Sequence, residues 1–299
     1  MTRSLPQEEK ILLWLEKKQK ERVMKYYGIP DLEHVQQWAA MGIPFEYNDF
    51  MWPQVLEDPQ EVQRRIQAYQ ALDRDRSQDT LHGPFLDITV HSSDRLIREA
   101  SDQRIRQACE ICLELGVKAM IIHTNFIPNF YVKTYRDGWV DRNEEYFRKL
   151  LEDYPSLWIY MENMFDEEPD CLVRLAQRME GERFAICLDL AHAYLSKTPV
   201  LQWLEACNSH MAHYHINDNH GKLDEHLPLG EGTAPWKEIF PQVKRDATVL
   251  KGEQRRKEWE EHRGKPPLPK HRQLWLLLKV YIKIPIVRTR LLEERIAES

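Results

Sequence analysis

Histidine and acidic residues recur in three short motifs of this 299-residue sequence. The first, Tyr160–Met164, reads Tyr-Met-Glu-Asn-Met and places Glu162 directly after an apolar run. The second, Cys187–His192, reads Cys-Leu-Asp-Leu-Ala-His and sets Asp189 three residues before His192. Carboxylates and neutral imidazoles are common ligands of Zn²⁺, Mn²⁺ and Mg²⁺, and one carboxylate can bridge two ions. Both motifs therefore predict ligands for a divalent cation.

The third motif offers the most ligands. His213–Asn219 reads His-Tyr-His-Ile-Asn-Asp-Asn, and it is followed by Asp224-Glu-His226 and then by Gly-Glu-Gly at residues 230–232. One predicted strand and the loop after it thus supply His215, Asp224 and His226. A single residue of this kind could equally serve structure, as an aspartate that caps a helix does. The number and spacing of these residues together favour a metal site.

These motifs lie at the ends of apolar runs that the sequence predicts as strands. The eight runs are Val23–Gly28, Ile43–Tyr47, Asp79–Ile88, Ala119–His123, Leu157–Glu162, Phe184–Asp189, Met211–Asn217 and Ala247–Glu253. Nearly every run finishes with a side chain that can bind metal. In chain order these residues are Glu46, His82, His123, Glu162, Asp189, His215 and Glu253.

Between the runs the sequence has helical spacing and charge. The predicted helices are Asp31–Ala40, Gln60–Leu72, Ser101–Leu115, Asn143–Leu151, Pro169–Met179 and Val200–Ala206. Alternation of β and α units is typical of a parallel sheet, and about 250 residues suffice for a (β/α)₈ TIM barrel. We predict an α/β fold, a single-domain (β/α)₈ barrel with a C-terminal helical extension; a doubly wound open sheet is the alternative. In a barrel all the strand ends share one rim, so the candidate ligands would converge there.

Composition changes only near the two ends of the chain. We predict a charged helical segment at residues 1–22, the barrel at residues 23–253 and a basic helical extension at residues 254–299. The extension would cover the barrel or a partner subunit, and contact with an anionic surface is the alternative. The apolar stretch Leu274–Val287 is interrupted by charge and proline before it reaches the ~20 residues that span a bilayer.

Charge and cysteine usage restrict the partners and the compartment. A formal net charge of -6 disfavours nucleic acid as a partner, because binding would need a local basic patch. Five cysteines scattered through apolar segments fit reduced thiols, including Cys109 and Cys112, which we interpret as packing residues. We expect a cytoplasmic protein that binds a small molecule, and the sequence is compatible with a homo-oligomer.

The motifs and their order resemble the xylose isomerase-like barrel superfamily, which includes sugar isomerases, epimerases and nucleases of the endonuclease IV type. The resemblance covers roughly residues 23–253. It implies a metal bound by the glutamate, aspartate, histidine and glutamate of strands five to eight, here Glu162, Asp189, His215 and Glu253. The endonuclease-like branch adds ligands that correspond to His82, His123, His192, Asp224 and His226. The resemblance thus implies a divalent ion (Mn, Mg or Zn), with room for more than one per chain.

Two departures from the superfamily bear on function. The eighth strand is short and carries Lys251 and Gly252 before Glu253, which makes this glutamate the least secure of the ligands. The DNA-inserting loop of the nuclease branch is missing, and residues 45–52 are instead acidic. This second departure argues against duplex DNA as the substrate.

We therefore expect a metal-dependent isomerase or epimerase of a sugar or sugar phosphate. Metal at Glu162 and its neighbours would polarise a carbonyl, while Glu162 or Glu253 moves the proton and His192 assists. A multi-zinc phosphodiesterase of the endonuclease IV type is the alternative, and a noncatalytic barrel with a degenerate eighth strand is the third. Glu46 and a predicted loop at residues 125–142, with Lys133, Arg136 and Trp139, are candidate substrate contacts; ordinary surface packing is the alternative for that loop.

Overall fold

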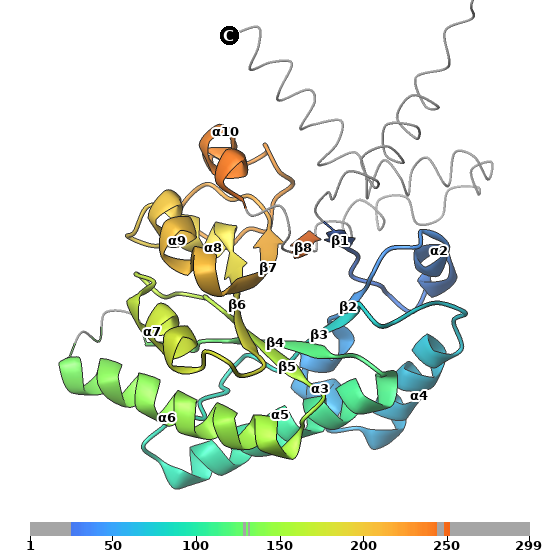
Figure 1. The fold of residues 1–299 in the computed structure, drawn as a ribbon. Coiled ribbons are helices and arrows are strands. Elements are labelled where there is room, and N and C mark those ends of the chain that lie inside the picture. The colour runs from blue at the N-terminus through green and yellow to red at the C-terminus, as the bar shows by residue number, and fades with distance from the viewer. Residues whose placement is uncertain (1–24, 128–129, 131, 244–247, 252–299) are drawn as a thin grey trace, which may run out of the picture.

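Eight parallel strands form one sheet in the computed structural model, which describes residues 25–127, 130, 132–243 and 248–251 (Figure 1). The strands run in the order β1-β8-β7-β6-β5-β4-β3-β2. Their bounds are β1 Lys25–Tyr27, β2 Glu46–Tyr47, β3 Thr80–His82, β4 Ala119–His123, β5 Trp158–Glu162, β6 Phe184–Asp189, β7 Met211–Ile216 and β8 Thr248–Lys251.

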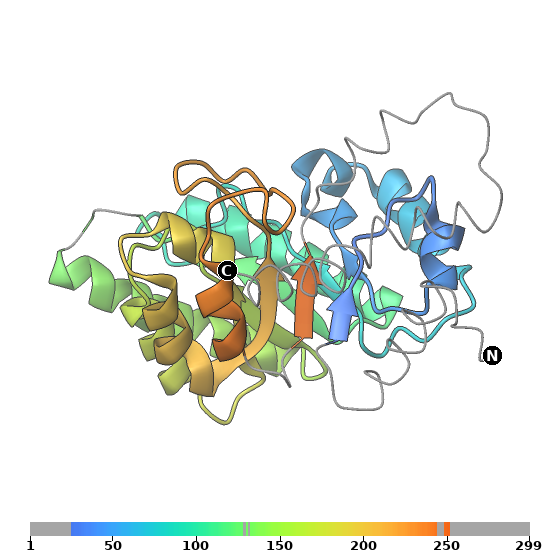
Figure 2. The ribbon, with the colours of Figure 1, turned by 90° about the horizontal axis from the view of Figure 1, so that it is seen from above.

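A short parallel bridge between Gly28 and Phe45 joins the two outer strands of this sheet. The backbone N–H of Gly28 donates to the Pro44 carbonyl at 2.9 Å, and the N–H of Glu46 donates to the Gly28 carbonyl at 2.9 Å. Gly28 suits this crossing because a Cβ there would lie 2.5 Å from the Trp38 ring. The bridge closes the sheet, so the predicted (β/α)₈ barrel is confirmed; β1 and β8 lie side by side in Figure 2.

Helices connect the strands and lie outside the sheet (Figure 1). The α-helices are α2 Val35–Ala40, α3 Pro53–Leu56, α4 Pro59–Gln70, α5 Arg95–Leu115, α6 Lys133–Asp153, α7 Asp170–Arg178, α8 Leu190–Leu195, α9 Val200–Cys207 and α10 Trp236–Ile239. Three 3₁₀ helices, η1 Asp49–Met51, η2 Asn208–His210 and η3 Phe240–Gln242, complete the described elements. Local sequence sets the limits of α5: the Asp94 side chain accepts from Leu96 N at its start, and Gly116 with φ +75° ends it.

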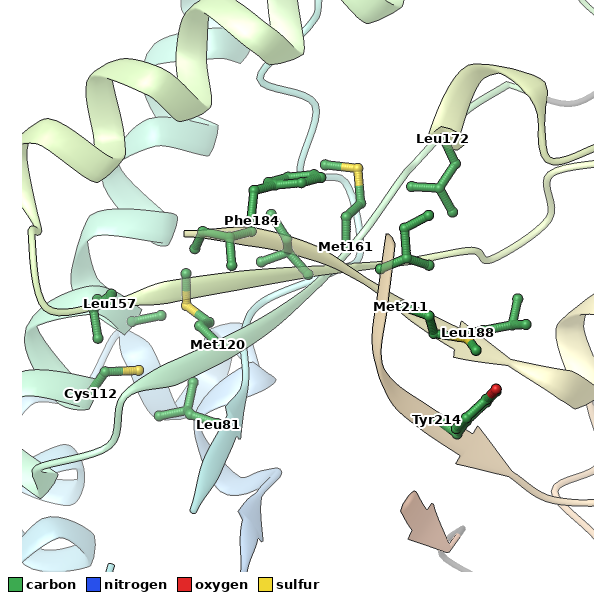
Figure 3. Packing of buried hydrophobic residues seen from close by; sticks show 14 of the residues in the cluster. Leu81, Cys112, Met120, Leu157, Met161, Leu172, Phe184, Leu188, Met211 and Tyr214 are labelled. Carbon is green, nitrogen blue, oxygen red and sulfur yellow. The ribbon is translucent and has the colours of Figure 1, made fainter. Parts of the chain in front are cut away.

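The core lies between the strands and the helices. All six residues of β6 are buried, as expected for a parallel strand that is covered on both faces. Figure 3 shows Cys112 of α5 and Leu172 of α7 among the side chains that pack on the strands. The five cysteines are free and buried, which agrees with a packing role for Cys109 and Cys112.

The third strand is shorter than predicted. We predicted residues 79–88, but β3 ends at His82 and only Gly83 continues the pairing, with its N–H on the Ile121 carbonyl at 2.8 Å. Pro84 follows and has no N–H to donate, so the ladder cannot continue. His82 is therefore a true strand end, and the residues after it form the rim.

The predicted loop at residues 125–142 is wrong over its second half, because α6 begins at Lys133 rather than Asn143. Its first turns present Tyr135 and Trp139, four residues apart, to the Phe126 ring, with centroids at 5.1 and 5.7 Å. This aromatic packing supplies the apolar face that a helix needs. From the sequence, Tyr135 and Trp139 were predicted to lie in a loop.

Several expectations fall on residues that the structure does not describe. The segments 1–22 and 254–299, and Glu253 with them, lie outside the described residues, and their assignments stay predictions. Among the described helices, none has both the length and the apolar character needed to cross a membrane. The cytoplasmic location and the homo-oligomer also stay predictions.

Candidate metal centre

Eight of the predicted ligands meet at the C-terminal ends of the strands, and we call them the ligand cluster. Register brings neighbours together: His123 of β4 pairs with Glu162 of β5, and Asp189 of β6 pairs with His215 of β7. The cluster comprises His82, His123, Glu162, Asp189, His192, His215, Asp224 and His226. This is the rim where active sites of such barrels lie.

Glu162 is the centre of the ligand cluster. Its Oε2 lies 3.1 Å from His123 Nε2 and 3.6 Å from His82 Nε2, while its Oε1 lies 3.0 Å from His215 Nδ1. The two facing nitrogens of His82 and His123 are themselves 3.2 Å apart. Glu162 is buried, and its Oε2 makes no hydrogen bond to any residue that the structure describes. A buried carboxylate oxygen without a donor, facing two imidazoles, is an arrangement that a cation would satisfy.

A second part of the ligand cluster surrounds Asp224. Its Oδ2 lies 3.2 Å from His192 Nε2 and 3.0 Å from His226 Nε2. His226 adopts φ +48°, a left-handed conformation that few residues other than glycine take. The loop after β7 thus holds His226, in a strained backbone conformation, beside Asp224. His192 approaches the same Asp224 carboxylate from α8.

The ligand atoms form a continuous chain of possible metal sites. Within the ligand cluster, three groups have ligand atoms within 4.8 Å of one another: His82 with Glu162 and His215, Glu162 with Asp189 and His192, and His192 with Asp224 and His226. Each group shares a member with the next. A fourth group, Cys187 with His213 and His215, adds two residues from outside the ligand cluster. The donor set, histidine nitrogen with carboxylate oxygen, matches zinc and related divalent ions, so the residues fit such an ion.

Hydrogen bonds fix the orientation of two of the imidazoles. His82 Nδ1 lies 2.9 Å from the Gly83 carbonyl, and His192 Nδ1 lies 2.8 Å from the Asn163 carbonyl. Because a carbonyl only accepts, each Nδ1 must carry the proton. Each Nε2 is then free to face the ligand cluster, the arrangement in which histidines commonly bind metal.

Asp189 is held in place by Asn163 and Asn217. Asn163 Oδ1 accepts from Asp189 N at 2.8 Å, and its Nδ2 donates to the Asp189 carbonyl at 3.0 Å. Asn217 Nδ2 donates to Asp189 Oδ2 at 3.2 Å, and Asp189 Oδ1 caps α8 by accepting from His192 N at 2.7 Å. The carboxylate therefore cannot rotate without breaking two hydrogen bonds, and Asn163 fixes the backbone that carries it.

The loop that carries Asp224 and His226 is organised by Asp218, which is fully buried. Asp218 Oδ2 accepts from Gly230 N and from the Trp236 indole, each at 2.8 Å. A Cβ at residue 232 would collide with the Asp218 carboxylate and the neighbouring backbone, which explains the glycine there. The Gly-Glu-Gly motif is thus a packing requirement of the loop.

Burial and neighbouring charge shift the pKa values in the ligand cluster. Burial alone would raise the pKa of the Glu162 carboxyl, but His215 and His123 hold it well below its ordinary value. Burial lowers the pKa of His123 to about 4 despite the nearby carboxylate. Burial would also lower the pKa of His192, yet Asp189 and Asp224 raise it to about 10. The ligand cluster therefore combines ionised carboxylates with a neutral imidazole and a strongly proton-binding one, all groups that a divalent ion can recruit.

Four residues were predicted to contact substrate, and the structure shows two of them buried and two in ion pairs on α6. Trp139 is fully buried and its indole donates to the Thr124 carbonyl at 3.2 Å. On α6, Lys133 pairs with Asp137, while Arg136 pairs with Glu168 and Asp170. Glu46 is also fully buried, and it approaches His213 and His215 instead of the surface. Trp139 and Glu46 thus have no exposed surface with which to contact a substrate, and the contacts of Lys133 and Arg136 stay predictions.

Three supporting residues were not singled out from the sequence: Asn163, His213 and Asp218. Signals for two of them existed. Asn163 directly follows Glu162, and His213 is two residues before His215, so a strand places both histidines on the same side. The role of Asp218 depends on loop contacts up to 18 residues away and had no local signal.

Comparison with known proteins agrees with this fold. A model of the family described as xylose isomerase-like TIM barrel matches residues 33–261. An uncharacterized protein of Methanocaldococcus jannaschii is 25% identical over 245 residues, which are 77% of this chain and 83% of that protein. A probable endonuclease 4 of Mycobacterium ulcerans is 24% identical over 166 residues, 51% of this chain and 63% of that protein.

Solved structures show the same fold. A D-tagatose 3-epimerase-like protein superposes with a TM-score of 0.63 at 20% identity, covering 89% of this chain and all of that one. The IOLI protein, solved with a zinc atom, has a TM-score of 0.60 at 17% identity, covering 76% and 87% of the two chains. Similarity at this level of identity concerns the fold.

Proposed function

Because this chain belongs to the xylose isomerase-like TIM barrel family, we propose that it is a metal-dependent enzyme that hydrolyses a small phosphoester. The observation that carries the proposal is the continuity of the ligand cluster, in which Glu162 and His192 each belong to two groups of ligand atoms within 4.8 Å. One ion would leave part of this set unused. Two or three ions would use all of it, and clusters of two or more ions are typical of phosphoester cleavage.

The residues of the ligand cluster would have different roles in the reaction. Glu162, which belongs to two of the groups of ligand atoms, and Asp189, held by two asparagines, would hold the metal at the strand ends. A divalent ion held here would supply Lewis-acid chemistry, polarising a phosphoryl or carbonyl oxygen and lowering the pKa of water. His226, at the more exposed edge of the ligand cluster, would orient the substrate with Asp224, because their side chains are 38% and 26% exposed.

The segment after β2, residues 48–58, contains no lysine or arginine for a phosphate backbone, which favours a small substrate over duplex DNA. Its acidic residue Asp49 is not free to accept a basic ligand, because Arg65 pairs with it at 2.5 Å and the Tyr69 hydroxyl donates to it. The segment folds as η1 and α3 against α4. Similarity to a probable endonuclease 4 supports phosphoester chemistry, whereas the formal net charge of -6 supports a compact substrate such as a sugar phosphate.

Isomerisation or epimerisation of a sugar, the reaction expected first from the sequence, is the second candidate. It is favoured by the epimerases among proteins of this fold and by the position of Glu162, a carboxylate that could move a proton next to a carbonyl. That reaction needs one ion and a second base. One ion would leave part of the ligand cluster unused, and this is why we place hydrolysis first. The predicted second base, Glu253, lies outside the described residues, and its role stays a prediction.

Metal analysis followed by a substrate panel tests the proposal. We expect two or three zinc ions per chain after reconstitution, and cleavage of 4-nitrophenyl phosphate, its bis-ester or a sugar phosphate, measured by released nitrophenol or phosphate. A single ion, no released phosphate and deuterium incorporation into a ketose in D₂O would establish the second candidate instead. Failure to bind any ion after reconstitution would exclude both reactions and favour the noncatalytic barrel.

A further inference from the structure

The imidazole of His215 lies between two buried carboxylates. Its Nδ1 is 3.0 Å from Glu162 Oε1 in the ligand cluster, and its Nε2 is 3.2 Å from Glu46 Oε1 on the opposite side of the ring. Glu46 belongs to β2, which is separated from β7 by β1 and β8, so its side chain reaches His215 from across the barrel. The pair cannot be foreseen from the sequence, because 168 residues lie between the two positions.

Glu46 is held rigidly in this position. It is fully buried, and the Thr80 hydroxyl donates to its Oε2 at 2.9 Å. Its other oxygen makes no hydrogen bond within the described part of the chain, and neither does His215 Nε2. Each of these two atoms is therefore available to the other, and Glu46 itself has no exposed surface with which to contact a substrate.

The orientation of the other imidazoles suggests a role for the contact between His215 and Glu46. His82 donates Nδ1–H to a backbone carbonyl and turns Nε2 to Glu162, and His192 donates Nδ1–H to a backbone carbonyl and turns Nε2 to Asp224. His215 is placed the other way round from His82, with Nδ1 toward Glu162 and Nε2 away from it, and among the described residues no backbone carbonyl accepts a hydrogen bond from either nitrogen. To leave Nδ1 unprotonated for an ion, its proton must sit on Nε2, and Glu46 is the acceptor there. A carboxylate in this place also increases the basicity of the ligand nitrogen.

We propose that Glu46 is a positioning residue of the metal centre: it accepts Nε2–H from His215 and so holds the tautomer in which Nδ1 faces the ion. This inference rests on the proposed metal-dependent function and adds a residue to it. It also replaces the expected substrate contact of Glu46 with a role beneath the ligand cluster. Loss of such an outer carboxylate typically weakens metal binding by about 10- to 100-fold.

The test compares zinc affinity in the full chain, measured by competition with a chromophoric chelator. Glu46→Leu removes the acceptor, whereas Glu46→Gln keeps a carbonyl oxygen for the Nε2 proton. We expect zinc binding to weaken about 100-fold in the first and about 10-fold in the second, the two ends of the usual range. Asp79→Asn is the matched control, since Asp79 is another buried carboxylate, paired with Arg74 and Tyr47 away from the ligand cluster. It should lower stability and leave zinc affinity unchanged.

The imidazole ¹⁵N spectrum of the zinc-loaded wild type provides a second readout that needs no variant at Glu46. With the His215 signals assigned through His215→Gln, we expect a protonated Nε2 and a metal-bound Nδ1. The reverse pattern, or wild-type zinc affinity in Glu46→Leu, would overturn the positioning role while the metal-dependent function stands. No zinc uptake by the wild type would overturn both.

Discussion

At the residue scale, the proposed function depends most on the two side chains that connect the three groups of ligand atoms within the ligand cluster. Glu162 touches histidines from three strands with its two oxygens, and His192 links the barrel ligands to the loop after β7. Removing a peripheral ligand would affect one ion. Removing Glu162 would affect two, so its loss should be the most damaging single change in the ligand cluster.

Glu162→Gln should therefore lose at least one ion per chain and reduce phosphoester cleavage by on the order of 10²–10³-fold, as loss of a central electrostatic contact does. The amide keeps the shape of the side chain but has no charge and only one ligand oxygen. Metal content and kcat/KM measure the effect. Glu145→Gln, on an exposed position of α6, is the control and should behave as wild type. A normal metal content in Glu162→Gln would contradict its part in two groups of ligand atoms.

His91 predicts how stability depends on pH. Burial, with a smaller effect of Arg142, lowers the pKa of this histidine to about 4 from 6.5. Between these values the unfolded chain binds the proton and the folded chain does not, so stability rises with pH and is lost as pH falls from 6.5 to about 4. The full loss is on the order of 3 kcal/mol.

Urea unfolding of wild type and His91→Gln across this range isolates the contribution, because the other titrating groups are common to both proteins. We expect the wild type to lose more stability than the variant as the pH falls from 6.5 to 4. Parallel curves for the two proteins would mean that His91 takes up its proton equally well in the folded chain.

At the element scale, the loop after β7 decides whether Asp224 and His226 reach the barrel. Backbone bonds between Asp218 and Leu227, at 2.8 and 2.7 Å, pin the loop as a closed turn, and the Asp218 carboxylate then joins its far end. These hydrogen bonds join residues of the loop to one another and to α10. The group of His192, Asp224 and His226 therefore depends on this loop, whereas the groups around Glu162 are built by the strands.

Asp218→Asn tests whether the ligands Asp224 and His226 depend on the loop while the ligands around Glu162 do not. The amide of the variant would turn an N–H toward the N–H donors that Asp218 now accepts from, those of Gly230 and Trp236. At least one buried donor would lose its acceptor, at a cost of about 1–3 kcal/mol in the free energy of unfolding. We expect the loop to lose its order and the protein to bind one ion fewer per chain, while the ions at Glu162 remain. Zinc titration by calorimetry distinguishes these sites. Lys222→Gln, an exposed change in the same loop, should leave the stoichiometry intact.

At the scale of the whole molecule, metal binding and folding should be coupled. The ligand cluster draws on β3, β4, β5, β6 and β7, together with α8 and the loop after β7. An ion bound there connects segments from residue 82 to residue 226 that only the folded barrel brings together. Such an ion binds the native state far better than the unfolded chain.

Removal of metal with a chelator should therefore lower the melting temperature, and zinc should restore it. Stabilisation reaches about 2.7 kcal/mol when free zinc is 100-fold above its Kd. Differential scanning calorimetry with and without chelator measures the shift. Glu162→Gln should show a much smaller shift than wild type, and an unchanged melting temperature in the chelated wild type would contradict a resident metal.

The sequence by itself determined the barrel and most of the ligand cluster. Both are encoded locally: apolar runs alternate with helical segments, and ligands stand at strand ends, where a parallel barrel necessarily gathers them. Helix α6 was predicted too short for a similarly local reason, because Tyr135 and Trp139 were interpreted as loop aromatics although their spacing is helical.

Only the tertiary structure decided what Glu46 does. From the sequence it was one more polar strand end at the rim; in the fold it lies beneath the ligand cluster against His215. The physical reason is that a strand's pattern tells which side of the sheet a residue occupies, but not which distant strand faces it across a closed barrel. The same holds for Asp218, whose partners are brought to it by the course of a loop.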